Sequence, residues 1–243
     1  SGAGYGLMMI DSLIVDGGYA SEKRQTHSSG NFTSCRDVWI MPDAELTGGF
    51  GISGNMRNDG LFTSSLNRNL SFCGNMDIGQ HYTNAQNNQT LYGSGLFRPD
   101  INAPVPSTQA DNQITMLRAD NTFSGLHLEM PLGVRNTLRI RSGRINTSST
   151  ALLTLGDSTS AGILSTDPSN SQWWAEDPFI GTMATWDGGM VNGPFRRWFE
   201  GAGADQESIM PIGIGMTRRT MSINFDSTHA GYLTAQFVIQ QPG

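Results

Sequence analysis

The amino-acid sequence predicts an all-β protein: an antiparallel sandwich or barrel, or an elongated fibre-like β fold, with long Gly- and Asn-rich loops. No window of about a dozen residues places apolar side chains at helical spacing without an interrupting Gly or Pro. Short stretches of alternating apolar and polar residues recur along the chain. Gly and Asn, which tolerate the positive φ angles of tight turns, separate these stretches.

The clearest alternating stretch lies near the C-terminus. Leu233, Ala235, Phe237 and Ile239 are expected to face one way, and the residues between them, up to Gln240, the other. The same pattern predicts shorter strands at residues 37–41, 114–117, 138–141, 151–155, 212–216 and 221–225. Turns are expected at Gly- and Asn-containing signals at residues 17–18, 48–49, 58–60, 188–189 and 192–194.

The composition changes part-way along the chain. Residues 42–98 are dominated by Gly, Asn, Ser and Thr, and a Pro-containing stretch at 99–106 leads to more regular strand patterns. We therefore expect a loop-rich N-terminal β region over 1–98 and a more compact C-terminal β domain over 107–243. A single domain with long decorated loops fits the same pattern equally well. No internal repeat in the sequence is strong enough to predict a solenoid or a propeller.

Charge is scarce and predominantly negative. Asp, Glu, Lys and Arg make up 15% of the residues, against roughly 25% in an ordinary globular protein. The net charge of −6 argues against binding to nucleic acid or to an anionic membrane. No apolar run approaches the roughly 20 residues of a membrane-spanning helix. We therefore expect neither a nucleic-acid partner nor insertion into a membrane.

Cofactor and metal chemistry are not indicated by the sequence. None of the histidines has the spacing that zinc ligands adopt; they stand alone at His27, His81, His127 and His229. The two cysteines, Cys35 and Cys73, form no Cys-x-x-Cys motif, and buried free thiols are favoured over a disulfide in a chain of this length. We expect no cofactor and no bound metal.

One pair of short motifs is a candidate for hydrolytic chemistry. A strand pattern runs into a Gly-Asp-Ser tripeptide that ends at Ser158, and an Asp-x-x-His motif follows at Asp226 and His229. These motifs resemble the first and last blocks of the SGNH/GDSL esterase family. The resemblance implies that Ser158 attacks an ester of an acetylated glycan, that His229 takes its proton and that Asp226 orients the imidazole.

The rest of the chain counts against an esterase. The intervening sequence is rich in Gly and Pro and leaves little room for the helical crossovers of a parallel α/β sheet. The Gly-x-Asn-Asp block of that family has no match here. A non-catalytic protein is the main prediction, and a shortened esterase or deacetylase remains the alternative.

Aromatic residues and arginines gather in a Gly-rich stretch, residues 173–199. Aromatic faces combined with arginine form anchors for partner proteins and platforms for sugar rings. Filling the core is the alternative role and the better expectation for most of them, whereas the two arginines are harder to bury and favour an interface. The candidate binding or interface residues are Trp173, Trp174, Trp186, Phe195, Arg196, Arg197, Trp198 and Phe199.

In its overall texture the chain resembles bacteriophage tail-fibre, tailspike and head-decoration proteins. It is rich in Gly, Asn, Ser and Thr, poor in lysine, β-rich, and carries aromatic residues in its loops. The resemblance extends over the whole chain and depends on no diagnostic motif. It implies a structural protein of the virion, assembled in the host cytoplasm. The expected partners are copies of itself in a trimer or other closed oligomer, other virion proteins and a host-surface glycan.

Overall fold

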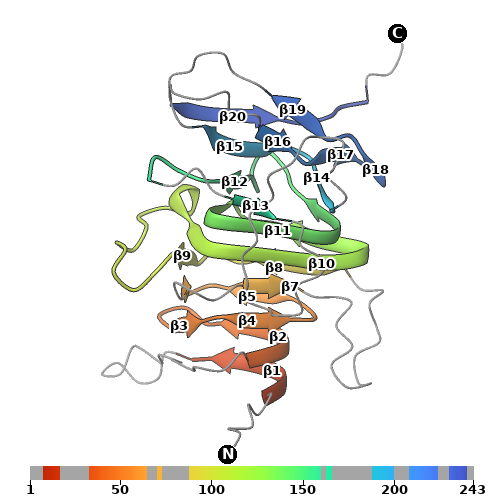
Figure 1. The fold of residues 1–243 in the computed structure, drawn as a ribbon. Helices are drawn as coiled ribbons and strands as arrows, with labels where there is room; N and C mark the ends of the chain where they lie inside the picture. Colours follow the sequence, from red (N-terminus) through yellow and green to blue (C-terminus); the bar gives the residue numbers. More distant parts are fainter. Residues whose placement is uncertain are drawn as a thin grey trace, which may run out of the picture.

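The computed structural model of the chain is nearly all β (Figure 1). It describes residues 8–16, 33–64, 70–72, 88–159, 163–165, 188–199, 208–223 and 230–239. Within these ranges the one helical element is a 3₁₀ turn, η1, at Gln109–Asp111. None of the helical structure in these ranges is long and apolar enough to cross a membrane. The β class predicted from the sequence is confirmed at this level.

Most strands are short, and β10 and β11 are much the longest. The strands are β1 (Met8–Val15), β2 (Thr33–Ile40), β3 (Glu45–Gly48), β4 (Phe50–Ile52), β5 (Met56–Asn58), β6 (Leu61–Ser64), β7 (Leu70–Phe72), β8 (Gln89–Tyr92), β9 (Leu96–Arg98), β10 (Gln113–Leu128), β11 (Leu132–Asn146), β12 (Leu153–Leu155), β13 (Ile163–Ser165), β14 (Met190–Asn192), β15 (Phe195–Phe199), β16 (Ser208–Met210), β17 (Ile212–Ile214), β18 (Thr217–Arg218), β19 (Met221–Ile223) and β20 (Gly231–Ala235).

Strands of the main sheet run parallel because the chain winds in successive coils that stack on one another (Figure 1). On one side of the coils, Ser34 of β2 pairs with Gly51 of β4, which pairs in turn with Ser71 of β7. On the next side, the second half of β2 pairs with β5, and β5 pairs with β8. Both columns meet the long strand β10, so the pairings close on themselves and the sheet forms a closed, barrel-like tube.

The coils from β10 onward, called the later coils below, continue the same stacking. β10 and β11 pair in parallel over most of their length, and β12, β13 and β14 each pair with a different part of β11. β15 then pairs with β12, and β17 with β14. The coils before β10 are called the early coils below. Their remaining side carries a separate parallel sheet, β3–β6–β9. Antiparallel pairs occur towards the C-terminus, where β20 joins β15, β18 joins β17 and β19 joins β16.

This arrangement shows that the predicted antiparallel sandwich or barrel, or elongated fibre-like fold, was wrong, because the strand pairs are parallel except near the C-terminus. Side-chain alternation reports which residues face the core, but it does not report strand direction. Parallel neighbours need a long connection, usually a helix, and here the other sides of each coil supply it. Insertions of unequal length, for example between β7 and β8, also hide the repeat from the sequence.

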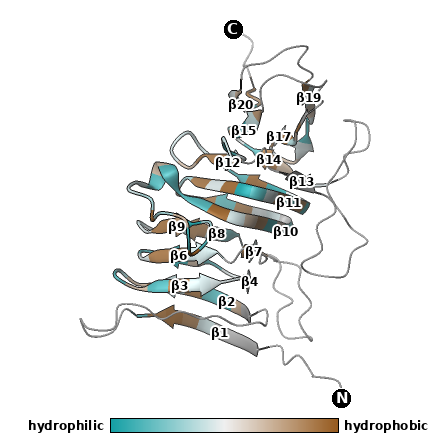
Figure 2. Cartoon of the chain, turned by 60° about the vertical axis from the view of Figure 1, so that its left-hand side comes forward, coloured by the Kyte–Doolittle hydropathy of each residue, from teal (hydrophilic) through white to brown (hydrophobic). Residues whose placement is uncertain are grey.

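Apolar side chains from successive coils stack inside the tube, and hydrophobic and hydrophilic residues alternate along its strands (Figure 2). Phe62 of β6 and Phe97 of β9 pair in register, and both are fully buried. The ring centroid of Phe62 lies 5.6 Å from that of Phe97 and 6.2 Å from that of Phe50. Burying each such ring contributes roughly 1.5–3 kcal/mol to the stability of the fold.

Cys35 belongs to the same core and is a free thiol. Burial raises its pKa to about 11. The thiol is therefore protonated and unreactive at neutral pH. Cys73 lies outside the described residues.

A buried ion pair crosses the outer face of the β3–β6–β9 sheet. Arg98 Nη2 in β9 lies 2.6 Å from Glu45 Oε1 in β3, and the two side chains are 8% and 4% exposed. Between them, Thr63 of β6 donates a hydrogen bond to Glu45 Oε1 (2.9 Å) and accepts one from Arg98 Nε (3.1 Å). The outward side chains of these coils therefore bind one another and leave little room for a ligand.

Candidate binding groove

A column of outward-facing residues crosses the later coils. The Leu and Val side chains on either side of Gly133 in β11 and of Thr154 in β12 are buried, so these two residues face outward. Strand pairing extends the column from Gln113 of β10 through Gly133 and Thr154 to Arg196 of β15 and Thr234 of β20. Neighbouring members of the column lie about 4.8 Å apart, the spacing of paired strands.

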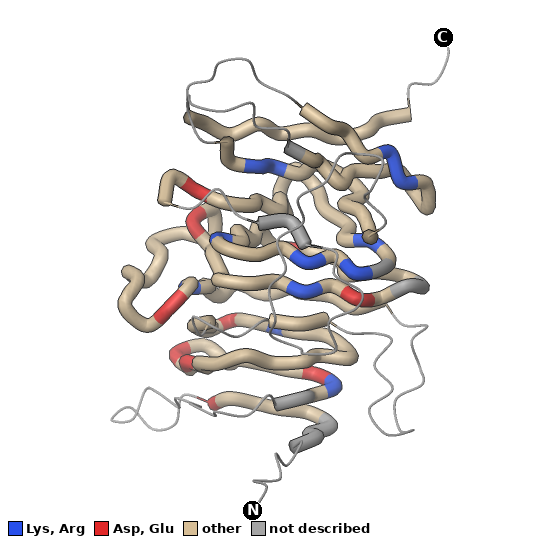
Figure 3. The backbone as a smooth tube through the Cα atoms, in the orientation of Figure 1, with Lys and Arg blue, Asp and Glu red and all other residues tan. Residues whose placement is uncertain are grey.

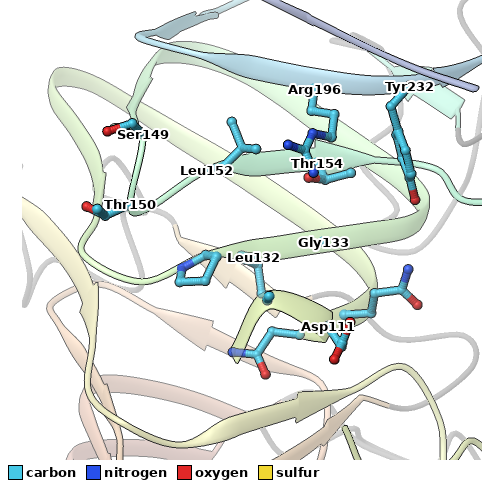
Figure 4. A pocket seen from close by; sticks show the side chains of 13 residues that line it. Asp111, Leu132, Gly133, Ser149, Thr150, Leu152, Thr154, Arg196 and Tyr232 are labelled. Atoms are coloured by element: carbon cyan, nitrogen blue, oxygen red, sulfur yellow. The ribbon is translucent and has the colours of Figure 1, made fainter. Parts of the chain in front are cut away.

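Gly133 hollows this column, because it places no side chain between Gln113 and Thr154. The result is a groove of about 570 Å³ (Figure 4). A Cβ atom at position 133 would lie 2.8 Å from the Asn112 carbonyl oxygen and 2.8 Å from Gln113 Cγ. Glycine is therefore the residue that permits the close approach of the two strands at the floor of the groove.

The walls of the groove come from separate parts of the chain. Arg196 and Tyr232 lie on one side of the floor, and Asp111 of η1 lies on the other (Figure 4). A turn before β12 brings Ser149 and Thr150 to one end. The lining thus offers guanidinium, phenol, carboxylate and hydroxyl groups in a cavity of the size that small-molecule sites have.

Tyr232 is the exposed aromatic residue of the groove, with 48% of its surface accessible. It pairs across the strands with Trp198, and the two rings pack edge to face with centroids 4.8 Å apart. Arg196 Cζ lies 5.6 Å from the centroid of the Tyr232 ring, and Arg196 Nε donates to Thr234 Oγ1 at 3.3 Å. These contacts hold the tyrosine ring and the guanidinium in fixed positions beside the floor.

Asp157, in the turn after β12, supports the floor through Gln113. Its Oδ2 accepts from Gln113 Nε2 at 2.9 Å, and its Oδ1 accepts from Thr159 N at 2.7 Å and Thr159 Oγ1 at 2.6 Å. Burial acts to raise the pKa of Asp157, but the bonds from Thr159 and Gln113 and the charge of Arg135 outweigh it and lower the pKa. The carboxylate is therefore ionised at neutral pH and accepts hydrogen bonds.

The phenol of Tyr232 stays protonated. Burial and the negative charge of Asp157 raise its pKa, against a smaller opposing effect of Arg196. Its hydroxyl can therefore donate a hydrogen bond as well as accept one at neutral pH.

The candidate interface residues of β15 fall into two groups. Arg196 lines the groove and Trp198 packs beside it, whereas Phe195 and Phe199 are buried in the core. Side chains alternate along a strand, so the two phenylalanines point inward and Arg196 and Trp198 point outward. Three further candidates lie outside the described residues: Trp173, Trp174 and Trp186.

The side chain of Arg197 lies on the inward face of β15, together with those of Phe195 and Phe199. Its Nη1 donates to the carbonyl oxygen of Ile209 at 2.7 Å. Burial lowers the pKa of Arg197 to about 10, so the guanidinium remains charged at neutral pH. Its contact joins β15 to β16, away from the groove.

Ser158, the nucleophile implied by the esterase resemblance, lies in the exposed turn after β12. Asp226 and His229 lie outside the described residues. No α-helix occurs in the part of the chain that the structure describes, whereas the sheet of that family relies on helical crossovers. The esterase alternative stays a prediction.

His127 is the histidine that the structure describes, and its Nε2 lies 3.2 Å from Asn146 Nδ2. Across the described ranges, no group of three or more His, Cys, Asp or Glu side chains is arranged to hold a metal ion.

Comparison with known proteins gives no match. A scan against models of known families, a search of curated proteins and a search of solved structures each find no significant similarity. The groove must therefore be interpreted from its own chemistry.

Sequence reasoning missed the residues that shape the groove. Tyr232 could have been identified from the sequence as a candidate binding residue, because it stands at an outward position of the alternating C-terminal strand. Its ring is exposed in the structure. The others come from different coils, and only the stacking of the coils brings them together: Asp111, Gln113, Gly133 and Thr154.

Proposed function

We propose that this protein is a non-catalytic structural subunit of a bacteriophage virion that binds a host-surface glycan in the groove. The groove carries this proposal, since it combines a small floor, an exposed tyrosine ring and several polar side chains. The scarcity of lysine and the abundance of Gly, Asn, Ser and Thr support the proposal that the protein is a virion subunit.

The groups that line this groove suit sugar recognition. A pyranose has apolar C–H faces that pack on an aromatic ring and hydroxyls that both donate and accept hydrogen bonds. Tyr232 provides the ring, while Asp111, Thr154 and Gln113 provide polar partners. All five column residues stand on paired strands, so little conformational freedom is lost when a ligand binds.

The direct test is binding to an array of bacterial surface oligosaccharides. The wild-type chain should bind a subset of them, and Thr154→Trp, which fills the groove, should lose that binding. The indole suits a strand position, so the fold should persist. Thr217→Trp, at an exposed position of β18 outside the groove, is the matched control and should bind normally. Unchanged binding by Thr154→Trp would exclude the groove as the glycan site.

Assembly with copies of the same chain is the second part of the proposal, and the C-terminal segment supports it. Pairing of β20 with β15 ends where Phe195 meets Ala235, because β15 begins there. The residues that follow carry exposed apolar side chains: Phe237 (37%), Val238 (70%) and Ile239 (77%). The sequence has no charged residue from Gly231 onward, and Figure 3 shows none in the described part of this segment. Such an uncharged strand-forming segment is suited to pair with another chain.

Light scattering on a sizing column tests assembly. The wild-type chain should elute as a trimer or another closed oligomer, and the double variant Val238→Lys/Ile239→Lys should elute as a monomer. Lysine on an exposed strand edge opposes pairing between chains. Melting temperatures of the two proteins at low concentration separate lost assembly from misfolding. A wild-type monomer at every concentration would contradict self-assembly and leave glycan binding to be judged by the array.

A further inference from the structure

The guanidinium of Arg196 is the cation of the groove that lacks an acidic partner within the described residues. No carboxylate among those residues lies within ion-pair distance of it, whereas Arg98 pairs with Glu45 and Arg135 lies within ion-pair distance of both Asp100 and Asp157. Its Nε bonds to the neutral Thr234 hydroxyl, and its face packs near the Tyr232 ring. The terminal nitrogens therefore remain to bind a ligand.

The carboxylates nearby do not neutralise Arg196. Asp157 is engaged by Gln113, Thr159 and Arg135. Asp111 lies on the opposite side of the groove floor, and its Oδ2 accepts from Thr108 Oγ1 at 2.9 Å (Figure 4). Arg196 is thus the cation that lines one side of the groove, and Asp111 is the carboxylate that lines the other.

We infer that the groove binds an acidic oligosaccharide, with a uronic-acid carboxylate paired to Arg196 and sugar hydroxyls donating to Asp111. This inference depends on the proposed glycan binding. A planar guanidinium binds a carboxylate through two parallel hydrogen bonds, which suits a carboxyl group carried on a sugar ring. Asp111 would repel an anion placed on its side, so the acidic group lies towards Arg196.

The position of Tyr232 fits the same orientation. Its ring stands beside Arg196, so a pyranose whose carboxylate meets the guanidinium can place an apolar face against the phenol. The open floor at Gly133 and Thr154 then accommodates the neighbouring sugar unit.

The test compares acidic and neutral members of the same oligosaccharide array. The tightest acidic binder is then converted to its carboxyl-reduced form, which keeps the sugar ring and replaces the carboxylate by a neutral alcohol. Affinities of both forms are measured by calorimetry for the wild-type chain, Arg196→Gln, Arg196→Lys and Arg219→Gln. The last variant removes the same charge from an exposed residue outside the groove.

We expect the wild-type chain to favour the acidic form by about tenfold or more, the effect of one charge-assisted bond. Arg196→Gln should bind both forms alike, Arg196→Lys should keep part of the preference, and Arg219→Gln should behave as wild type. Added salt should weaken binding of the acidic form alone.

Preferential binding of neutral glycans, or an acidic preference that survives in Arg196→Gln, would overturn this inference while leaving glycan binding intact. Absence of binding to every member of the array would overturn both.

Discussion

Two outward-facing arginines of the same tube lie in contrasting surroundings. Arg98 in β9 is 8% exposed in its side chain, pairs with Glu45 and joins β3, β6 and β9 together. Arg196 in β15 lines an open groove and has no acidic partner among the described residues. Asn112, next to the start of β10, bonds to the backbone of Phe97 and so connects the two regions.

The difference lies in what stands next to each arginine. Thr63 fills the space between Arg98 and its acid, so the outward groups of the early coils bind one another. In the later coils Gly133 leaves the floor empty, and the guanidinium of Arg196 faces the space. The outward groups of the early coils are therefore engaged with one another, whereas the later coils carry the open groove that we propose as the glycan site.

The largest effect is expected from breaking the ion pair of the early coils. Arg98→Met should leave the Glu45 carboxylate buried without its guanidinium and lower the free energy of unfolding by about 3–5 kcal/mol. Arg196→Met should change it by only about 0.5 kcal/mol or less. Urea unfolding followed by circular dichroism measures both.

The double variant Glu45→Gln/Arg98→Met is the control for this pair. It removes both charges and should recover most of the lost stability. Equal destabilisation by Arg98→Met and Arg196→Met would contradict the division between the two regions.

A smaller effect is expected from the aromatic wall of the groove. Tyr232→Ala should weaken glycan binding by up to about tenfold, the value of one aromatic contact, with little change in melting temperature. Tyr232→Phe keeps the ring and should retain most of the affinity. A titration of each variant with the best ligand of the array decides this, and normal binding by Tyr232→Ala would remove the residue from the site.

The smallest effect concerns a ladder of polar side chains between β10, β11 and β14. Asn192 Nδ2 donates to Asn146 Oδ1. The amide nitrogen of Asn146 therefore faces His127 and donates to its Nε2. To accept this bond, Nε2 must be unprotonated. Burial and the charge of Arg144 lower the pKa of His127, against an opposing effect of Glu129. The unfolded chain therefore takes up the proton first, and stability falls as the pH drops below about 6.5.

Melting temperatures at pH 7.5 and pH 5.5 measure this contribution. The wild-type chain should lose slightly more stability on acidification than His127→Gln, whose amide does not titrate. Identical pH dependence of the two proteins would show that His127 does not contribute.

Part of this account could be predicted from the sequence. Alternation predicted strands at residues 138–141 and 221–225; the first lies within β11, and the second overlaps β19 at Met221–Ile223. The difficulty of burying arginine singled out Arg196, which the structure places in the lining of the groove. It also predicted a strand up to Gln240, whereas β20 ends at Ala235 because β15 offers no further partner. Strand direction and the meeting of Gly133 with Thr154 depend on contacts between coils, and no spacing within one strand encodes them.

Glycan binding in the groove is the central claim, and a crystal structure of the chain with its tightest-binding oligosaccharide tests it most directly. We expect a sugar over Gly133 and Thr154, with one ring face against Tyr232 and its acidic group at Arg196. A ligand bound elsewhere on the tube, with the groove empty, would contradict the claim.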